Sequence, residues 1–400
     1  MHNDHRRLGR ELHLFDTSPV IGAGLPMWMP DGAIVRTELE RFAAEQADLS
    51  GCQRIFTPVL AKRELFERSG HWDKFAEDMF PPMHVGGEEL VLRPANCPSH
   101  VQVYAAAQHS WRDLPVRYTE NAAMFRSELS GVLGGLSRVR QISLDDAHVF
   151  CRPDQVVDEV RLALEAIRST YAVLGIEIAY HRLSVRGEHG TYAGSDEDWE
   201  LAESELETAL QQTGTPYRRA PGEAAFYGPK IDVQVIDAGE REETLSTVQI
   251  DRVMPERFAL SYVSSAGDRQ RPVMIHRGLL SSMERMVALL IERYAGRLPT
   301  WLAPHQVDLL PVDPRRHHSA AQDVLSRLER AGVRARIRAD GSLGSRVRDA
   351  HRDRATYIAV IGDQELADDG LAVNGAGVQI DAFIAALKDE IATRALDRVF

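Results

Sequence analysis

Residues 120–150, ENAAMFRSELSGVLGGLSRVRQISLDDAHVF, bring together charged side chains whose spacing suits a bound ligand better than one face of a helix. Arg126 and Glu128 are alternate residues, so on an extended strand their side chains point to the same face. The planar guanidinium can bind a phosphate or a carboxylate, and the neighbouring carboxylate can accept a hydrogen bond from an exocyclic amine. Arg138 and Arg140 share a face in the same way, after a glycine-containing turn. We therefore predict two extended segments joined by a loop that carries ligand-binding charges, although an exposed hairpin with surface ion pairs has the same residue types.

Two histidines, a cysteine and an aspartate form a second set of reactive side chains, but they are widely separated in the sequence. Asp146 and His148 follow the arginine-rich loop, and their types suit a metal site, an acid–base pair or an ordinary polar surface. Cys97 and His276 are too distant for spacing alone to identify a metal site. Arg285, in the segment MERM, fits a ligand-binding arginine on a helix or a solvated charge. The residue types alone leave these alternatives open.

The elements that must position these residues are predicted from hydrophobic periodicity. An amphipathic period predicts four helices, over residues 33–48, over 154–173 with Asp154 as N-cap, from Ser195 onward, and over 278–296. A β-branched and aromatic run predicts a strand over residues 54–60. Alternation of apolar and polar residues predicts antiparallel strands over residues 230–239, 245–251 and 258–263.

A proline-containing stretch at residues 297–306, RLPTWLAPHQ, is the best candidate for a domain boundary. Beyond it, strand and helix patterns alternate, which is typical of a small α/β domain. The strands are predicted at residues 307–312, 333–338 and 356–362, and the helices at 318–331, 343–352 and from about 381. A chain of 400 residues also favours two domains, which we place at residues 1–298 and 299–400.

Composition excludes several classes of protein. With 44% hydrophobic and 26% charged residues, the chain is that of a folded globular protein, and no apolar run approaches the ~18–20 residues that cross a membrane. The charged N-terminus, MHNDHRRLGREL, lacks the apolar core of a signal peptide. Three cysteines argue against a disulfide scaffold, so we expect a cytoplasmic protein. The net charge of −12 argues against indiscriminate binding of nucleic acid but allows a local basic cleft.

Several segments, in order along nearly the whole chain, resemble the class II aminoacyl-tRNA synthetases and, among them, the threonyl-tRNA synthetase family. These segments are DHRRLGRELHLF, GAGLPMWMPDGAIVRTELERF, SGHWDKFAEDMF, LRPANCPSH, FRSELSGVLGGLSRVRQISLDDAHVF, AFYGPKIDVQV, STVQID, VMIHRGLLSSMER and PTWLAPHQV. The resemblance implies an α+β fold, with an antiparallel sheet flanked by helices followed by a small α/β anticodon-binding-like domain. It also implies a homodimer, formed through the helix and strand at residues 33–60, and a protein that binds ATP, L-threonine and tRNA but no membrane.

The same resemblance implies roles for the charged residues of the opening stretch. Arg126 corresponds to the arginine that contacts both the α-phosphate of ATP and the carboxylate of the amino acid. Glu128 corresponds to the residue that accepts from the adenine amine, and Arg285 to the arginine on the γ-phosphate, with Mg²⁺ accompanying the nucleotide. The full set of implied ATP-binding positions is Arg126, Glu128, Arg138, Ile142, Thr244 and Arg285.

Cys97, His148 and His276 match the three zinc ligands of the family. The resemblance implies a Zn²⁺ ion that binds the amino and hydroxyl groups of threonine, and a site that requires a hydroxyl rejects valine far better than an apolar pocket does. The implied amino-acid-binding positions are Asp146, Tyr227, Lys230, Thr247 and Gln249.

The chain departs from the family pattern in four respects. It begins where the catalytic domain begins, so we expect the N-terminal editing domains to be absent. Ile142 stands at an aromatic position that stacks on adenine, while Leu144 and Thr244 stand at glutamine positions. Arg348 and Glu365 match anticodon-reading positions, whereas Asn374 stands where the family has an arginine. We expect the loss of that phosphate-binding charge to weaken tRNA binding.

Three functions are compatible with these features. The first is ATP-dependent activation of L-threonine to threonyl adenylate and its transfer to the 3′ end of threonine tRNA, without an editing domain in the same chain. The second is a synthetase-like ligase that passes the activated amino acid to a carrier protein or small molecule. The third is a non-catalytic paralogue that acts as a regulator or as a resistance stand-in, although the presence of Arg126, Arg285 and the three metal-binding residues weighs against it.

Overall fold

The computed structural model describes residues 3–400 of the chain, which form two compact units. The larger unit consists of Pro19–Leu25 and Glu40–Met286, and the smaller unit consists of the described part of Met1–Ser18 together with Pro26–Leu39 and Val287–Phe400. Two helices, α2 (Pro30–Leu49) and α9 (Met283–Arg293), contribute residues to both units. The division predicted between residues 298 and 299 stays a prediction. Within residues 3–400, no helix combines the length and the apolar content that a membrane crossing needs.

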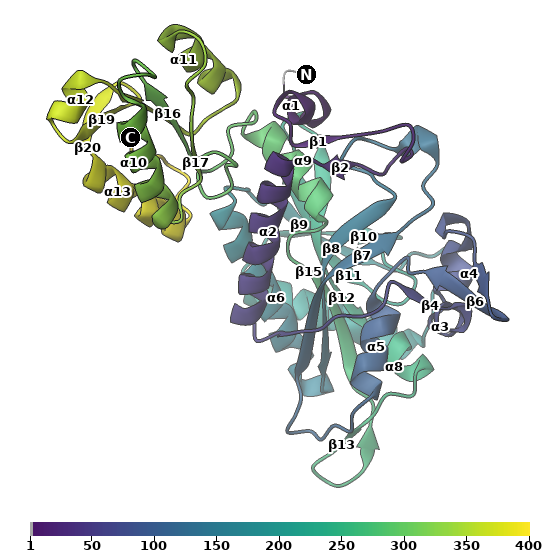
Figure 1. Ribbon diagram of the computed structural model, residues 1–400. Coiled ribbons are helices and arrows are strands. Elements are labelled where there is room, and N and C mark those ends of the chain that lie inside the picture. Colours follow the sequence, from purple (N-terminus) through teal and green to yellow (C-terminus); the bar gives the residue numbers. More distant parts are fainter. Residues whose placement is uncertain (1–2) are drawn as a thin grey trace. The chain divides into compact units, whose positions relative to one another are not determined.

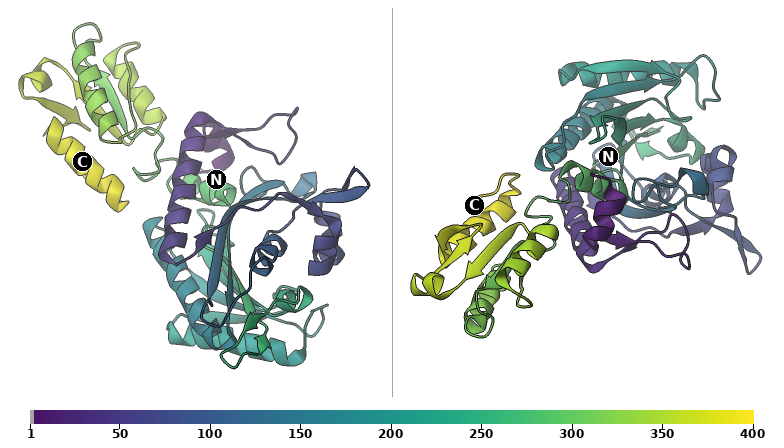
Figure 2. Two further views of the ribbon diagram at one scale, coloured as in Figure 1. Left: turned by 60° about the horizontal axis from the view of Figure 1, so that its bottom comes forward. Right: turned by 90° about the horizontal axis from the view of Figure 1, so that it is seen from above.

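The larger unit is built on an eight-stranded sheet with the order β10-β9-β11-β12-β15-β8-β7-β3 (Figure 1). Its strands are β3 (Gln53–Arg54), β7 (Val116–Phe125), β8 (Gln141–Cys151), β9 (Tyr180–Val185), β10 (Tyr217–Pro221), β11 (Lys230–Ile236), β12 (Glu242–Asp251) and β15 (Val273–Gly278). All neighbouring pairs are antiparallel except the two edge pairs, β10–β9 and β3–β7. The strands twist along the sheet, as Figure 1 and Figure 2 show. This arrangement confirms the predicted antiparallel sheet flanked by helices.

Helices cover both faces of this sheet, and the period of two along β8 decides which residues each face presents. Helix α6 (Val156–Val173) contacts β8, β12 and β15 through a buried apolar stripe that includes Val160, Leu164 and Ile167. Helices α5 (Cys97–Ala105) and α8 (Val253–Arg257) share a hydrophobic cluster with Phe150 and Met274. Because Phe150 has the same parity as His148 on β8, α5 and α8 lie on the face that carries the candidate site residues.

Shorter elements complete the larger unit. They are β4 (Leu60–Lys62), α3 (Arg63–Ser69), α4 (His71–Phe75), η1 (Ala76–Asp78), β5 (Met83–Val85), β6 (Glu88–Leu92), η2 (Ser130–Val132), η3 (Pro153–Gln155), α7 (Asp196–Gln212), β13 (Tyr262–Val263) and β14 (Arg269–Gln270). The helix predicted from Ser195 is confirmed as α7, because the Ser195 side chain caps it by accepting from the backbone N–H of Asp198.

Two of the predicted elements differ in their bounds from the observed ones. The strand predicted at residues 54–60 is interrupted: β3 ends at Arg54 and β4 begins at Leu60. Pro58 lacks an N–H for a sheet ladder, and the Arg93 side chain takes the carbonyl of Thr57 instead. Helix α6 begins at Val156, because Asp154 lies in the turn η3, where its carboxylate accepts from Arg152 rather than capping the helix.

Two later predictions are also corrected. Only Tyr262 and Val263 of the predicted strand 258–263 are extended, because the backbone turns at Ala259, whose φ is 51°. The helix predicted over residues 278–296 begins at Met283, because β15 continues to Gly278 and a loop precedes the helix.

The smaller unit contains a five-stranded sheet with the order β17-β16-β18-β19-β20, parallel among the first three strands and antiparallel in the last two pairs. Its elements are α1 (His5–Glu11), β1 (Phe15–Asp16), β2 (Met27–Trp28), β16 (Val307–Pro311), α10 (His318–Arg330), β17 (Ala335–Ile337), α11 (Leu343–Arg352), β18 (Tyr357–Ile361), α12 (Asp363–Ala367), β19 (Gly370–Val373), β20 (Ala376–Gln379) and α13 (Ile380–Thr393). The predicted alternation of strand and helix is thus confirmed.

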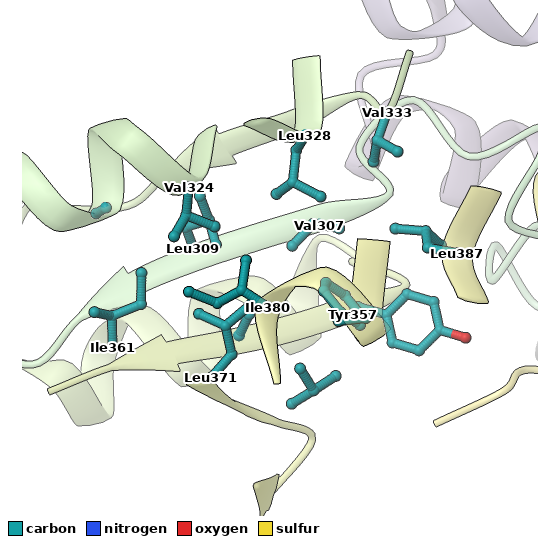
Figure 3. Packing of buried hydrophobic residues seen from close by; sticks show 14 residues of the cluster. Val307, Leu309, Val324, Leu328, Val333, Tyr357, Ile361, Leu371, Ile380 and Leu387 are labelled. Atoms are coloured by element: carbon teal, nitrogen blue, oxygen red, sulfur yellow. The ribbon is translucent and has the colours of Figure 1, made fainter. Parts of the chain in front are cut away.

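One face of the five-stranded sheet packs against α10 and α13. Figure 3 shows Val324 and Leu328 of α10 and Leu387 of α13 directed toward Leu309 and Tyr357 of the sheet, and all of these side chains are buried. Helix α11 covers the opposite face through a separate cluster. The small α/β unit therefore has a core of its own.

Candidate active site

Two cavities of the larger unit meet at three charged side chains. The first cavity has a volume of about 420 Å³ and is lined by residues that include His71, Cys97, Tyr227, Lys230 and Gln249. The second cavity has a volume of about 290 Å³ and is lined by residues that include Met124, Val139, Ile142, Leu144, Ser282 and Arg285. Arg126, Glu128 and Arg138 line both cavities. A ligand that filled both would therefore pass these three residues.

Arg126 and Glu128 do not lie on a strand, which corrects the prediction that an extended strand aligns them. Strand β7 ends at Phe125, and the chain between β7 and β8 is held by the N–H of Arg126 donating to the carbonyl of Arg140 at 2.9 Å. The Glu128 carboxylate pairs with Arg138 at 2.8 Å. Arg140 instead donates from Nε and Nη2 to the backbone carbonyl of Glu128, at 3.0 and 2.8 Å. Of the two arginines, Arg138 thus faces the cavities and Arg140 braces the loop.

Cys97, His148 and His276 come together although the sequence separates them widely. Cys97 is the first residue of α5, and His148 and His276 are directly opposite each other on β8 and β15. Their sulfur and nitrogen donor atoms all lie within 4.8 Å of one another, and His148 Nε2 is 3.0 Å from His276 Nδ1. Burial raises the pKa of the Cys97 thiol and lowers the pKa of His148, so burial favours the neutral form of both groups at neutral pH.

Further buried polar groups, absent from the sequence predictions, extend from these histidines. His100 Nδ1 lies 2.9 Å from His148 Nδ1, and Glu120 pairs with Arg93 at 2.9 Å and lies 3.4 Å from His100 Nε2. Asp251 accepts from His276 Nε2 at 3.0 Å. The spacing of Cys97 and His100, three residues apart in one helical turn, is the sequence signal that points to His100.

The sequence predictions also omitted His71, which lines the first cavity. Its Nε2 lies 3.5 Å from Cys97 Sγ and its Nδ1 lies 2.9 Å from Ser69 Oγ. Burial lowers the pKa of His71 to about 3, so this imidazole is neutral at physiological pH. His71 therefore offers the first cavity a neutral donor and acceptor beside the cysteine. His71 lies in SGHWDKFAEDMF, one of the segments that carry the family resemblance, but no role was assigned to it there.

The predicted amino-acid-binding residues form two short hydrogen-bonded chains beside the first cavity. Tyr227 donates its hydroxyl to Gln249 Oε1 at 2.6 Å, and Gln249 Nε2 donates to Thr247 at 2.9 Å. Lys230 donates to Asp232 at 3.0 Å. Asp146 Oδ1 lies 3.8 Å from His148 Nε2, and burial raises its pKa. Of the five predicted positions, Tyr227, Lys230 and Gln249 line the first cavity, while Thr247 contacts Gln249 and Asp146 lies beside His148.

The second cavity has an apolar wall and a charged end. Ile142 and Leu144 are alternate residues of β8 and line it together with Met124. At the other end, Arg285 donates from Nη1 to the backbone carbonyl of Thr244 at 3.2 Å. The side chain of Thr244 is engaged elsewhere, because its hydroxyl accepts from Gln234 at 2.7 Å.

Two buried carboxylates fix the loop that presents Arg285. Asp145 Oδ2 accepts from the backbone N–H groups of Leu279 and Leu280, at 3.1 and 3.0 Å. Glu284 Oε2 accepts from the N–H of Ser143 at 2.9 Å. Asp145 thus ties the loop before α9 to β8, and Glu284 ties the first turn of α9 to the same strand, which carries the cavity wall.

The predicted anticodon residues lie in the smaller unit and have different local roles. Arg348 is exposed on α11. Glu365 Oε2 accepts from the N–H of Gly362 and so caps the short helix α12. Asn374 and Gly375 form the turn between β19 and β20 with φ of 49° and 93°, the pattern of a type I′ turn. The Asn374 amide also accepts from Ile358 N–H at 3.2 Å, so this side chain is committed to the fold.

Comparison with known proteins gives consistent matches in both units. Residues 83–294 match the family model of the tRNA synthetase class II core domain (G, H, P, S and T), and residues 306–389 match an anticodon binding domain. A threonine–tRNA ligase from Geobacillus sp. (strain WCH70) is 46% identical over 397 residues, which cover 97% of this chain and 62% of that protein. The chain therefore spans about three fifths of the length of such relatives.

Solved structures extend this similarity to the fold. A crystal structure described as the RNA binding domain of threonyl-tRNA synthetase from Cryptosporidium parvum Iowa II superimposes with a TM-score of 0.91 at 32% identity, covering 99% of each chain. A putative threonyl-tRNA synthetase from Aeropyrum pernix superimposes with a TM-score of 0.85 at 26% identity, covering 99% of this chain and 98% of that one.

Proposed function

The chain belongs to the threonyl-tRNA synthetase family of class II aminoacyl-tRNA synthetases, and on this premise we propose that it activates L-threonine with ATP and transfers it to threonine tRNA. The observation that supports this activity best is the pair of cavities that share Arg126. The first cavity carries cysteine and histidine donors, and the second carries an apolar wall with Arg285 at its end. These are surroundings suited to an amino acid and to a nucleotide, respectively.

The activation step joins the two ligands where the cavities meet. A carboxylate oxygen of threonine attacks the α-phosphorus of ATP, and the bond from that phosphorus to the bridging oxygen breaks to release pyrophosphate. Arg126, which lines both cavities, would contact both the carboxylate and the α-phosphate, while Arg285 would neutralise the charge of the departing phosphates. Mg²⁺ belongs to this step as part of the ATP substrate. A hydroxyl at the 3′ end of tRNA then attacks the acyl carbon and AMP leaves.

The donor set of the first cavity fits Zn²⁺. One sulfur and two imidazole nitrogens are the ligand types that zinc prefers, and three protein ligands leave a coordination position open. Bound zinc would supply a Lewis acid that orients the amino and hydroxyl groups of threonine. In this proposal Asp146, which lies 3.8 Å from His148, would accept from the threonine hydroxyl, and Tyr227, whose ring stacks on that of His276, would contact the amino group. Valine offers no hydroxyl, so it would leave Asp146 unpaired.

The smaller unit supports tRNA as the acceptor. Its match to an anticodon binding domain is joined by a basic segment, residues 327–354, which contains nine arginines and four acidic residues. Most of these arginines pair with carboxylates or are buried, but Arg330 and Arg348 are exposed and suit contact with a phosphate backbone. The second candidate, a ligase for a non-tRNA acceptor, is favoured by the following segment, residues 363–397, which has eight acidic and two basic residues and commits Asn374 to a turn.

We further propose a cytoplasmic homodimer formed through residues 33–60. Leu49 and Phe56 are each 82% exposed, and Leu60 is 38% exposed, so this region carries apolar surface that a second copy would bury. The three cysteines are free, which suits a reducing compartment.

The test of the proposed function is exchange of labelled pyrophosphate into ATP with threonine, serine, valine or no amino acid, followed by charging of threonine tRNA. Exchange with threonine together with charging is the expected result. Exchange without charging would favour the second candidate, and a lack of exchange in zinc-loaded protein would exclude both catalytic proposals.

A further inference from the structure

A chain of buried polar groups passes through two of the three candidate metal ligands, His148 and His276. Asn96 Nδ2 lies 2.5 Å from His100 Nε2, and His100 Nδ1 lies 2.9 Å from His148 Nδ1. His148 Nε2 lies 3.0 Å from His276 Nδ1, and His276 Nε2 lies 3.0 Å from Asp251. Every member is at most 6% exposed, so these groups depend largely on one another for their hydrogen bonds.

The groups at the two ends of the chain, Asn96 and Asp251, determine which nitrogen of each histidine carries a proton when no metal is bound. A neutral imidazole donates from one nitrogen and accepts at the other, whereas the Asp251 carboxylate only accepts. His276 must therefore donate from Nε2 and accept at Nδ1 from His148 Nε2. His148 Nδ1 then accepts from His100 Nδ1, and His100 Nε2 accepts from the Asn96 amide. Each group is satisfied, but the Nε2 atom of His148 carries a proton.

A metal ion at Cys97, His148 and His276 needs the opposite arrangement. His148 must offer its Nε2 lone pair, so its proton has to lie on Nδ1 and be donated to His100 Nδ1. His100 then carries its own proton on Nε2 and needs an acceptor there. The two rings hold two protons in both arrangements, so only the positions of the protons change.

Glu120 is placed to be that acceptor. Its Oε2 lies 3.4 Å from His100 Nε2, and the carboxylate is fixed by Thr57 Oγ1 at 2.6 Å and by Arg93 at 2.9 Å. Asn96 Nδ2 lies 3.4 Å from the same Glu120 oxygen, so the amide keeps an acceptor when it no longer donates to His100. We propose that His100 and Glu120 are positioning residues that set the tautomer of His148 and thereby present its Nε2 to the metal. This inference rests on the metal site of the proposed function.

The chain offers a matched control for the alternative that these groups only stabilise the core. Glu159 on α6 is buried, like Glu120, and holds an arginine, Arg117, at 2.6 and 2.7 Å. It lies on the helix that covers the opposite face of the sheet. Glu159→Gln removes the same kind of buried ion pair without touching a histidine of the chain.

The experiment measures the Zn²⁺ dissociation constant of the full chain by competition with a chromogenic chelator, in parallel with urea unfolding. We expect His100→Leu, which leaves His148 Nδ1 without an acceptor, to weaken zinc binding about 10–100-fold, and Glu120→Gln to weaken it about 10-fold. His100→Asn keeps an amide oxygen near the position of Nδ1 and should stay within about threefold of wild type. Glu159→Gln should lower stability but leave the zinc affinity unchanged.

The outcomes separate this inference from the proposed function. Wild-type affinity in folded His100→Leu and Glu120→Gln would overturn the positioning role while leaving the zinc site intact. Equal weakening by Glu159→Gln would overturn it too, because the affinity would then follow stability. If His100→Leu does not fold, the contrast between Glu120→Gln and Glu159→Gln decides. A wild-type chain that binds no zinc would instead remove the metal from the proposed function.

Discussion

The two cavities of the larger unit differ in the side chains that set their ligand preference. The first adjoins, at Cys97, a set of buried polar groups that hold one another, from Arg93 and Glu120 to His276 and Asp251. The second has an aliphatic wall that includes Ile142 and Leu144, with Arg285 in addition to the three charged residues that it shares with the first cavity. An unpartnered buried polar group costs about 1–3 kcal/mol, whereas an apolar contact changes gradually with area. We therefore expect the first cavity to discriminate strongly against ligands that leave its polar groups unpartnered. The affinity of the second cavity should instead change gradually with the apolar area that its wall offers.

The largest expected effect comes from removing the thiol of Cys97 from the first cavity. Cys97→Ala removes one of three metal ligands, so we expect stoichiometric zinc to be lost and threonine-dependent pyrophosphate exchange to fall by about 1,000-fold or more. Binding of ATP in the second cavity should change little. Zinc content by emission spectrometry and the exchange assay check this prediction.

Cys151 supplies the control for that variant. It is a free, fully buried cysteine at the end of β8 and belongs to neither cavity lining. Cys151→Ala should keep both zinc and exchange activity. A Cys97→Ala chain that retained its zinc would show that the first cavity does not depend on the cysteine.

For the second cavity, the largest loss of activity should follow from a change at Glu284, the buried carboxylate that precedes Arg285 and holds α9 to β8. Glu284→Ala leaves the N–H of Ser143 without its acceptor and frees the first turn of α9. Because a displacement of about 1 Å can cost about 100-fold in rate, we expect kcat/KM for ATP to fall by about 100-fold through Arg285. The KM for threonine should be nearly unchanged.

Glu284→Gln provides the conservative comparison, because its amide oxygen can still accept from Ser143. It should recover most of the activity of the wild type. A loss of the same size in both variants would mean that the negative charge, and not the tie to β8, is what matters.

The polar network of the first cavity should also make stability depend on pH. Burial alone would raise the pKa of Glu120, but the interactions with His100, Thr57 and Arg93 outweigh it and lower the pKa from 4.5 to about 2. A carboxylate whose pKa is lower in the folded state stabilises the fold above its unfolded pKa and loses that contribution as the pH falls from 4.5 toward 2.

Glu120→Gln removes this dependence. We expect it to be less stable than the wild type at pH 7 by about 2 kcal/mol, and the difference to shrink between about pH 5 and pH 3. Urea unfolding followed by circular dichroism across this range checks the sign. A difference that grows on acidification would contradict it.

The sequence and the structure agree best where local patterns decide the outcome. Helix α11 spans Leu343–Arg352, as predicted, and Ser195 caps α7, because periodicity and capping are local properties. The strand expected at residues 54–60 is wrong in its middle, because Arg93, distant in sequence, takes its carbonyls.

The candidate site also divides into residues that the sequence identified and residues that only contacts distant in sequence bring into place. The resemblance to the synthetases named Cys97, His148 and His276, but neither it nor the residue types named His100, Glu120 or His71. These three owe their proximity to the register of β7 with β8 and to the packing of α4 and α5. Spacing in one sequence carries no such information, so a buried network can be seen only once the strands are paired.

The smallest expected effect tests whether the second cavity is as adaptable as its aliphatic wall suggests. Ile142 is half-buried on β8 and faces a cavity of about 290 Å³. Ile142→Phe offers a flat face on which a purine can stack, and an aromatic pair contributes about 0.5–1.5 kcal/mol. We expect the KM for ATP to fall about threefold, with zinc content and the KM for threonine unchanged. Ile236→Phe, at an exposed end of β11, is the control and should alter none of them. If Ile142→Phe instead weakened ATP binding by tenfold or more, the aliphatic wall would fit its ligand closely. The second cavity would then select its ligand as strictly as the first, and the proposed difference between the two cavities would be wrong.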